Sequence, residues 1–513
     1  MKVSEISYQD TNKFSNLVLD YLKKDVKLES FVNHFPTLEN FEKQISEKKT
    51  HSIDRVVLAD VLNKQNAILS ISEKTKLNIE SLKESSTFTL TTGHQICLFT
   101  GPLYFIYKII STINMAEELE GKYPNINFVP VFWMATEDHD FKEINHIHIF
   151  GKKITWDSKQ GGAVGRMNLD GLESVLTKLK SALGTSENAD KLISLFEKSY
   201  LNHDNLADAT RYLVNELFGK YGLVILDGDD KRLKEQFISS IKKDILEQGF
   251  EKSITKCSED LSSKYKSQAF VRSINFFKLS DGKRELIKDK ISEYEIENNS
   301  VSFSPNVLLR PLYQETILPN IAYIGGGAEV AYWMQLKTSF RQENIPFPIL
   351  ILRNSVLFMD VKQNKKRRDL GFSICDLFLE EHQLQKKFVL NQNDVVVSLK
   401  DEMDAVEALY SSITAKTTDV GLQNSIKSQQ QKQLKSFKQL EEKFFRLAKQ
   451  KNESSLNQIS KIKQRLFPDN SLQERYHNFI PFYLKGGDNF IEILKENLNP
   501  LNPNFVILNP KIK

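Results

Sequence analysis

Four consecutive ionisable residues follow an apolar run and are the first candidates for catalysis: Glu137, Asp138, His139 and Asp140. Charged side chains directly after a buried strand are costly unless they pair with one another or bind something. A carboxylate beside a histidine can act as a general base, bind an amine or hold a metal ion. Metal binding is the weaker interpretation of the cluster, because no His-x-x-x-His pair accompanies it. Alternatively, the cluster is a solvated acidic turn without a function. Asn145, a few residues further on, is an additional binding candidate.

A second candidate segment lies where a predicted strand gives way to a helix. Glycine lets the backbone approach a ligand closely, and the free N–H groups at the start of a helix attract anions. The side chains of His94 and Gln95 can donate hydrogen bonds to a phosphate or a carboxylate. Alternatively, the polar residues only cap the helix. The binding candidates here are Gly93, His94, Gln95, Gly101, Tyr104 and Lys108.

A third candidate is a glycine triplet between a strand and a helix: Gly325, Gly326 and Gly327, followed by Glu329. The GxGxxG spacing of dinucleotide-binding proteins is not met, and no GxxxxGK[ST] P-loop occurs in the sequence. The triplet can still form a cradle for a phosphate or a carboxylate. Glu329 either offsets the helix dipole or holds a substrate ammonium or hydroxyl group.

Two arginines could hold an anionic group. Arg310 precedes Gln314 and Glu315, and Arg353 ends an apolar run. A guanidinium can bind a carboxylate or phosphate through two hydrogen bonds. The structural alternative for Arg310 is a salt bridge with Glu315. We take Arg310, Gln314 and Arg353 as binding candidates.

The elements that must position these residues alternate between strand and helix. Apolar runs predict strands over residues 87–91, 128–134, 222–227, 320–324 and 346–352, and helices are expected over 102–120, 206–220 and 329–343. This alternation indicates an α/β fold with a Rossmann-like, doubly wound parallel sheet. Ligands of such sheets bind beyond the carboxyl ends of the strands, where all three segments fall.

The chain divides into several predicted parts around this core. We expect an N-terminal helical segment (1–85), a Rossmann-like core (86–155, 205–250 and 305–390) and two inserted connecting domains (156–204 and 251–304). An α-helical coiled-coil region (391–470) and a tail returning to the core (471–513) follow. The coiled coil is indicated by apolar residues at three/four spacing, which could be buried within a helical hairpin or between two subunits: Leu434, Phe437, Leu440, Phe444 and Leu447.

Composition excludes several classes of protein. The 70 Lys plus Arg nearly balance 66 Asp plus Glu, so no nucleic-acid partner is expected. No stretch approaches the roughly 20 apolar residues that span a bilayer, and no signal peptide is recognisable. Three scattered cysteines argue against a disulfide framework. We expect a cytoplasmic protein.

The segments TTGHQICLFTGPLYFIYKII, VPVFWMATEDHDFKEINHIHIF, SPNVLLRPLYQETILPNIAYIGGGAEVAYW and FPILILRNS together resemble the cysteine ligase family of bacillithiol biosynthesis, as does the tail LQERYHNFIPFYLKGGDNFIEILKENLNPLNPNFVIL. The resemblance implies a Rossmann core with two insertions and a coiled coil that forms a homodimer. It also implies a ligase that joins cysteine to the amine of glucosaminyl-malate.

The resemblance does not fix how cysteine is activated. A carboxylate needs a leaving group before it can acylate an amine, so ATP or another nucleotide is implied by analogy with other amide-forming enzymes, and no cofactor is certain. Two other functions stay open from the residues alone. One is a metal-dependent hydrolase using Glu137 to Asp140, and the other is a dimeric scaffold that binds a nucleotide or thiol without catalysis.

Overall fold

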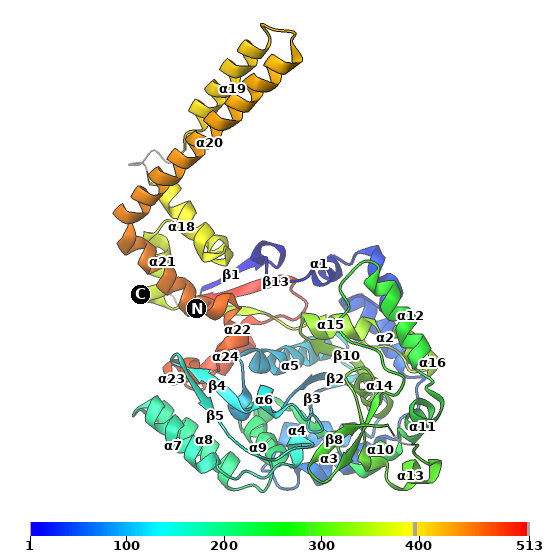
Figure 1. Cartoon of the computed structure of the whole chain (residues 1–513). Coiled ribbons are helices and arrows are strands. Elements are labelled where there is room, and N and C mark those ends of the chain that lie inside the picture. The colour runs from blue at the N-terminus through cyan, green and yellow to red at the C-terminus, as the bar shows by residue number, and fades with distance from the viewer. Residues whose placement is uncertain (1, 289, 393–397, 510–513) are drawn as a thin grey trace.

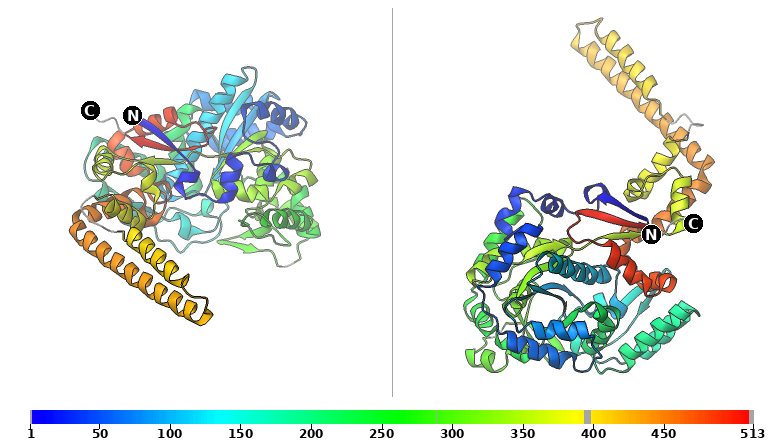
Figure 2. Two further views of the ribbon diagram at one scale, coloured as in Figure 1. Left: turned by 90° about the horizontal axis from the view of Figure 1, so that it is seen from above. Right: turned by 180° about the vertical axis from the view of Figure 1, so that it is seen from behind.

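The computed structural model describes residues 2–288, 290–392 and 398–509. These residues form a body built around a central sheet, and a long helical arm projects from it (Figures 1 and 2). None of the described helices combines the length and the apolar composition that crossing a bilayer requires.

In the described part of the chain, five parallel strands form the central sheet in the spatial order β11-β10-β2-β3-β6. They are β2 (Thr87–His94), β3 (Asn127–Met134), β6 (Val224–Asp227), β10 (Asn320–Gly325) and β11 (Ile349–Leu352). The chain adds strands outward from β2 in one direction and then, from β10 on, in the other. The predicted Rossmann-like, doubly wound sheet is therefore confirmed, and its order reverses between β2 and β10.

Helices cover both faces of this sheet. Along β3, Val131 and Trp133 face one core cluster, whereas Phe132 and Met134 face another. Because successive side chains of a strand point to opposite faces, a continuous apolar run is the pattern of a strand buried on both sides. The helices that contact the strands of this sheet include α3 (Arg55–Asn66), α4 (Glu73–Ser81), α5 (Tyr104–Lys122), α9 (Leu206–Phe218) and α15 (Gly327–Met334). The segments around the strands also contain α10 (Lys231–Glu235), α11 (Ile238–Glu247), α14 (Arg310–Ile317) and α16 (Lys337–Gln342).

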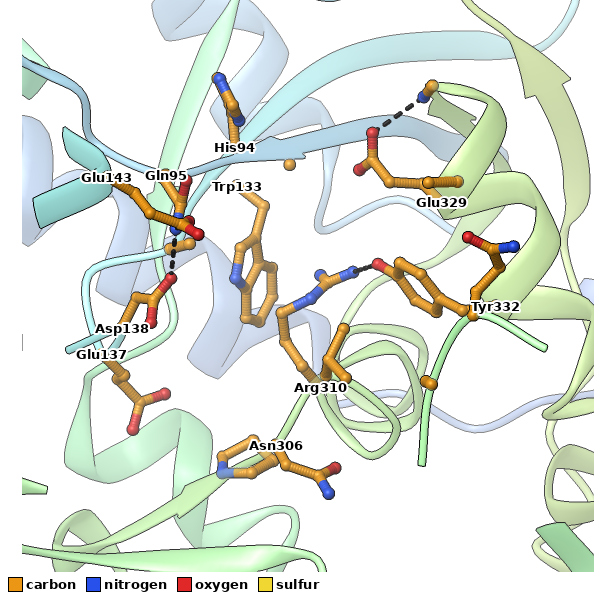
Figure 3. A pocket seen from close by; sticks show the side chains of 18 of the residues that line it. His94, Gln95, Trp133, Glu137, Asp138, Glu143, Asn306, Arg310, Glu329 and Tyr332 are labelled. Atoms are coloured by element: carbon orange, nitrogen blue, oxygen red, sulfur yellow. Dashed lines mark hydrogen bonds between the residues drawn. The ribbon is translucent and has the colours of Figure 1, made fainter. Parts of the chain in front are cut away.

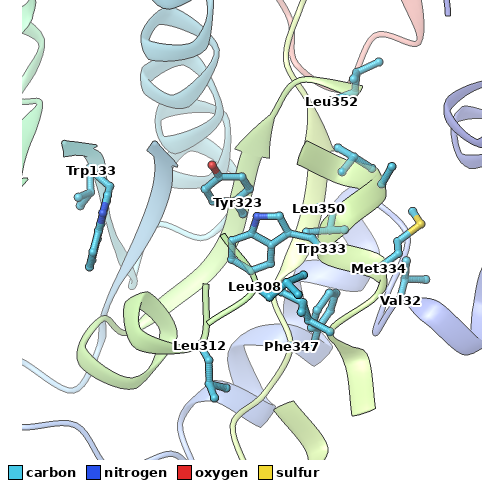
Figure 4. Packing of buried hydrophobic residues seen from close by; sticks show 14 of the residues in the cluster. Val32, Trp133, Leu308, Leu312, Tyr323, Trp333, Met334, Phe347, Leu350 and Leu352 are labelled. Carbon is cyan, nitrogen blue, oxygen red and sulfur yellow. The ribbon is translucent and has the colours of Figure 1, made fainter. Parts of the chain in front are cut away.

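One predicted helix is wrong in its extent. The helix expected over residues 329–343 is two helices, α15 and α16, with a break at Gln335 and Leu336. The Gln335 side chain is fully buried at this break, and its amide donates a hydrogen bond of 2.8 Å to Ser258 Oγ. Trp333, just before the break, stacks on Tyr323 of β10 with ring centroids 4.3 Å apart (Figure 4). The break thus lets α15 pack on the sheet while Gln335 anchors a neighbouring segment.

Two groups of elements interrupt the alternation of strands and helices. The first contains α6 (Phe141–Ile144), the hairpin of β4 (His146–Ile149) and β5 (Lys152–Thr155), α7 (Leu172–Leu183) and α8 (Glu187–Leu201). The second contains α12 (Glu251–Ser262), β7 (Phe276–Ser280), β8 (Lys283–Leu286), α13 (Glu293–Asn298) and β9 (Phe303–Pro305). In the second group β7 pairs with both β8 and β9, so a small antiparallel sheet lies beside the carboxyl edge of the central sheet.

The N-terminal segment is not wholly helical as expected. It contains α1 (Asn16–Leu22) and α2 (Leu38–Lys48), but it begins with the strand β1 (Lys2–Ser7). This strand pairs antiparallel with β13 (Asn504–Asn509), which in turn pairs with β12 (Val356–Phe358). Of β1, only Ile6 is buried, so its local sequence carries little strand signal. The partner that stabilises it lies at the other end of the chain.

The remaining C-terminal helices include those that build the arm. They are α17 (Val361–Asp369), α18 (Glu381–Leu390), α19 (Lys400–Thr414), α20 (Val420–Lys451), α21 (Glu453–Leu466), α22 (Gln473–Tyr476), α23 (Ile480–Gly486) and α24 (Asn489–Asn497). Helices α19 and α20 lie side by side as a hairpin that points away from the body (Figures 1 and 2). Part of the predicted coiled-coil region is therefore a helical hairpin.

Candidate active site

A cavity of about 780 Å³ opens at the carboxyl edge of the central sheet, where the strand order reverses. Residues of all three candidate segments line it, together with residues of the second inserted group (Figure 3). The sequence candidates in its wall are Gly93, His94, Gln95, Tyr104, Lys108, Glu137, Asp138, Arg310, Gly326, Gly327, Glu329 and Arg353. The sheet topology thus brings together residues that are more than 250 positions apart in the chain.

An ion pair between Lys108 and Glu329 forms part of the cavity wall. Lys108 Nζ lies 2.5 Å from Glu329 Oε2 and donates a hydrogen bond of 2.7 Å to the carbonyl oxygen of Gly93. The other oxygen of Glu329 accepts a hydrogen bond of 2.7 Å from the Tyr323 hydroxyl. Lys108 was expected to bind an anion from solution, but its charge is already matched by Glu329.

Glu329 also caps the N-terminus of α15. Its Oε2 accepts a hydrogen bond of 2.8 Å from the backbone N–H of Gly326. Burial by itself would raise the pKa of Glu329, but Lys108 and the hydrogen-bond donors outweigh burial and hold this pKa below its usual value. Burial lowers the pKa of Lys108, and the Glu329 charge opposes that shift. Glu329 therefore lies where it offsets the helix dipole, and it also lines the cavity. Its binding of a substrate ammonium or hydroxyl group stays a prediction.

Arg310 reaches the cavity, and no described carboxylate forms a salt bridge with it. The structural alternative, a salt bridge between Arg310 and Glu315, does not occur, because Glu315 is fully buried and pairs with Lys48 at 3.5 Å. The guanidinium donates hydrogen bonds to Gln314 Oε1 at 2.9 Å and to the Tyr332 hydroxyl at 3.4 Å. It also lies within 6.0 Å of the ring centroids of an aromatic cage: Trp133, Tyr323 and Trp333. Rings and neutral acceptors hold the side chain in place while leaving its charge available to an anion.

Arg353 is held by an internal partner. It pairs with the buried carboxylate of Glu474 at 2.7 Å, so the structural reading of this arginine holds. Its Nε is buried and has no hydrogen-bond partner among the described residues. A Cβ atom placed on Gly326 would lie 3.8 Å from this Nε, at the start of α15. The glycine therefore leaves room for a ligand atom near an unsatisfied donor.

The carboxylates of Asp138 and Glu143 lie on the side of the cavity opposite Arg310 (Figure 3). Gln95 Nε2 donates to Asp138 Oδ2 at 2.7 Å and to Glu143 Oε2 at 2.8 Å. Neither carboxylate has a lysine or arginine partner in the described part of the chain, although His139 lies 3.5 Å from Asp138. By contrast, Glu137 is neutralised by Lys234 at 2.5 Å. Figure 3 shows Asp138 and Glu143 across Trp133 from Arg310. The cavity thus has an acidic wall and a basic wall.

His94 is a neutral, half-buried residue of the cavity wall. Burial, reinforced by the Lys108 charge, lowers the pKa of His94 to about 3. Its ring contacts those of Tyr104 and Phe105, and its Nε2 has no hydrogen-bond partner among the described residues. An imidazole of this kind can exchange a hydrogen bond with a ligand but does not carry charge near neutral pH.

Six candidates lie outside the cavity wall and have contacts of their own: Gly101, His139, Asp140, Asn145, Gln314 and Gly325. Gly101 has a φ of +64° and accepts a hydrogen bond from Asn478, so it serves a turn. His139 Nδ1 lies 3.1 Å from Arg284. Asn145 donates to the carbonyl oxygen of Trp156 at 3.0 Å. Their roles in binding or catalysis stay predictions.

Several residues of the cavity wall were not predicted from the sequence: Trp133, Glu143, Arg272, Arg284, Asn306, Tyr332 and Arg475. Trp133 could have been found, because it lies next to the end of the apolar run that precedes Glu137. Arg272 and Arg284 belong to the second inserted group, and Arg475 belongs to α22 near the C-terminus. Nothing in the sequence near these arginines indicates that they reach the carboxyl edge of a distant sheet.

Comparison with known proteins agrees with this architecture. Residues 1–354 match the N-terminal Rossmann-like domain of the bacillithiol biosynthesis protein BshC, and residues 356–510 match the C-terminal coiled-coil domain of the same protein. The chain belongs to the BshC family. The resemblance inferred from the sequence motifs is thereby confirmed, and the two family domains meet at the end of β11.

Curated relatives cover the chain almost end to end. A protein of Christiangramia forsetii is 44% identical over 99% of both chains. One of Flavobacterium johnsoniae is 44% identical over 98% of this chain and 99% of its own. One of Cytophaga hutchinsonii is 35% identical over 97% of both. Each is named "Putative cysteine ligase BshC". The comparisons therefore favour a ligase over the metal-dependent hydrolase and the scaffold.

Proposed function

We propose that this protein joins the carboxyl group of cysteine to the amine of glucosaminyl-malate through an amide bond, as the final step of bacillithiol synthesis. The observation that supports this most directly is the pair of oppositely charged walls in one cavity. The acceptor carries an amine and two carboxylates, so it needs both kinds of surface. The names of the relatives point to the same reaction.

On the basic wall, Arg310 and the start of α15 would hold the malate carboxylates. The Arg310 charge is uncompensated by any carboxylate within 4.0 Å among the described residues. The buried Nε of Arg353 adds a donor beside Gly326. Backbone N–H groups at a helix start add a partial positive charge.

On the acidic wall, Asp138 would act as general base. The amine nitrogen attacks the carbonyl carbon of an activated cysteine, the bond from that carbon to its leaving group breaks, and the amine proton passes to Asp138. Gln95 orients this carboxylate through its hydrogen bond of 2.7 Å. In other enzymes, a positioned general base typically raises the reaction rate by roughly 10²- to 10⁴-fold.

The activating group would come from ATP or another nucleotide bound in the same cavity, by analogy with other amide-forming enzymes. The volume of about 780 Å³ falls within the usual range for small-molecule sites. We further propose that the protein is cytoplasmic and that it forms a homodimer through α19 and α20.

The direct test mixes the purified protein with glucosaminyl-malate, cysteine and ATP and follows the products by mass spectrometry. We expect the amide product together with one nucleotide product, and the ratio of AMP to ADP identifies the leaving group. Reactions without cysteine or without glucosaminyl-malate are the controls. Tight binding of glucosaminyl-malate with no amide formed under any nucleotide would instead support the scaffold.

A further inference from the structure

Arg475 occupies an unusual place, because it lies in the wall of the active-site cavity but belongs to the C-terminal domain of the family. The short helix α22 that carries it is fixed against β12. Gln473 Nε2 donates to the carbonyl oxygen of Phe358 at 3.0 Å, and Gln473 Oε1 accepts from the N–H of the same residue at 2.9 Å. The backbone beside Arg475 is therefore firmly placed.

The preceding residue strengthens this attachment. Glu474 is fully buried and accepts hydrogen bonds from Arg353 at 2.7 Å, from Ser355 Oγ at 3.1 Å and from the N–H of Val356 at 3.1 Å. Breaking a buried charge pair of this kind is strongly unfavourable. These contacts of Gln473 and Glu474 fix the backbone of Arg475 near the carboxyl end of β11, although Arg475 belongs to the C-terminal domain.

The Arg475 guanidinium itself is exposed and uncommitted. It has no hydrogen bond, ion pair or ring contact among the described residues. Three other cations of the wall already have partners within the protein. Lys108 pairs with Glu329, Arg353 pairs with Glu474, and Arg284 lies 4.0 Å from the ring centroid of Phe277.

Arg475 lies on the side of the cavity that Tyr104 and Arg353 form. Burial raises the pKa of the Tyr104 hydroxyl, and the charges of Arg353 and Arg475 partly oppose that shift. The Arg353 guanidinium carbon lies 5.2 Å from the centroid of the Tyr104 ring. Both guanidinium groups therefore act electrostatically on the same tyrosine in the cavity wall.

We propose that Arg475 is a specificity-determining residue that binds one carboxylate of the acidic acceptor through its guanidinium. Arg310 would hold the second carboxylate from the other domain. A planar guanidinium binds a carboxylate with two parallel hydrogen bonds, which gives both orientation and charge matching. This inference rests on the proposed function, because the acceptor of that reaction supplies the two carboxylates.

The test measures binding by calorimetry with four proteins: the wild type, Arg475→Met, Arg475→Lys and the control Arg465→Met. Arg465 is an exposed arginine of the same domain outside the cavity wall. The ligands are glucosaminyl-malate, its dimethyl ester and ATP. We expect Arg475→Met to weaken binding of the diacid roughly tenfold, as loss of a charge-assisted hydrogen-bond pair implies. Arg475→Lys should be intermediate, and Arg465→Met should match the wild type.

The ester separates a carboxylate contact from a general disturbance. Wild type and Arg475→Met should bind the dimethyl ester within about twofold of each other, because the charge that Arg475 recognises is gone. Equal binding of the diacid by both proteins would overturn the inference, and so would an equal loss for diacid and ester. A loss for ATP alone would assign Arg475 to phosphate instead. If the wild type binds no glucosaminyl-malate at all, the proposed function fails as well.

Discussion

The Asp138 carboxylate and its neighbours show how one turn can contain both a site residue and solvent-facing charges. Asp138 lines the cavity and is oriented by Gln95, whereas Asp140, two residues on, is exposed and outside the wall. The two aspartates therefore form a matched pair for testing the acidic wall.

We expect Asp138→Asn to lower kcat at least about tenfold, because the amide cannot accept the amine proton. Asparagine keeps an oxygen that can accept the hydrogen bond from the N–H of His139, which is 2.7 Å long in the wild type. Thermal unfolding should therefore change little. Steady-state kinetics and circular dichroism measure both effects. Asp140→Asn is the comparison variant. Because Asp140 lies outside the cavity wall, we expect this variant to retain wild-type turnover, which would contradict the catalytic role predicted for Asp140 from the sequence. An equally active Asp138→Asn would remove the Asp138 carboxylate from the chemistry.

Lys108 leads to a different expectation, because its partner is inside the protein. Its side chain is 4% exposed and pairs with Glu329, so removing it leaves a carboxylate without its counter-charge. We expect Lys108→Met to lower the free energy of unfolding by roughly 3 kcal/mol, as for other broken buried ion pairs. Urea unfolding measures the loss, and Lys122→Met, at an exposed position of the same helix, is the control.

A second variant checks the cause of that loss. Combining Lys108→Met with Glu329→Gln removes both charges, so the double variant should be more stable than Lys108→Met alone. If Lys108→Met unfolds at the same urea concentration as the wild type, the pair contributes nothing to stability. Lys108 would then be free to bind an anion, as its sequence position suggested.

Among the elements, the sequence predicts best what local periodicity determines. Apolar runs identified all five strands of the central sheet, and the alternation with helices indicated their topology. The carboxyl ends of those strands then located the cavity. What the sequence does not predict depends on partners far along the chain. The strand β1 is defined by β13, and Arg475 reaches the cavity because Glu474 is anchored by Arg353.

A buried carboxylate joins α11 to the second inserted group and makes that junction sensitive to pH. Asp244 is fully buried and accepts hydrogen bonds from the backbone N–H and the side-chain amide of Asn275. Burial raises the pKa of Asp244 from 3.8 to about 6, against the effect of these donors. Since the folded-state pKa exceeds the unfolded one, the stability that Asp244 contributes is present below pH 3.8 and is lost as the pH rises through about 6.

We therefore expect the free energy of unfolding of the wild type to fall, relative to Asp244→Asn, by about 2 kcal/mol between pH 4.5 and 7.5, since one pKa unit corresponds to about 1.4 kcal/mol. Denaturant unfolding at several pH values measures this difference. Asp244→Asn also loses a hydrogen-bond acceptor, which changes the free energy of unfolding by the same amount at every pH. This change does not affect the test, because only the pH dependence of the two proteins is compared. Asp260→Asn, at an exposed position of α12, should show no such difference from the wild type. Parallel curves for wild type and Asp244→Asn would mean that this carboxyl group titrates normally.

On the scale of the whole molecule, the arm presents an apolar surface that its own hairpin does not cover. Of the apolar stripe on α20, Leu434 is 9% exposed, whereas Leu440 is 42%, Phe444 is 40% and Leu447 is 62% exposed. Helix α19 begins at Lys400 and has 15 residues against 32 in α20, so among the described helices α19 can pair with only the first half of α20. Burial within the hairpin therefore accounts for only part of the stripe.

A homodimer would cover this surface, because two-fold pairing of one helical arm with another is a common way to bury such a stripe. We expect light scattering to report a dimer for the wild type at micromolar concentration. Replacing Phe444 and Leu447 together by Glu should give a monomer, since each buried carboxylate would lose its hydration. Leu77→Glu is the matched control, because Leu77 is an equally exposed leucine, at 62%, on α4 of the body. That variant should remain dimeric, and both should keep the unfolding transition of the core. A monomeric wild type would show that the exposed stripe has no partner in a second copy of the chain.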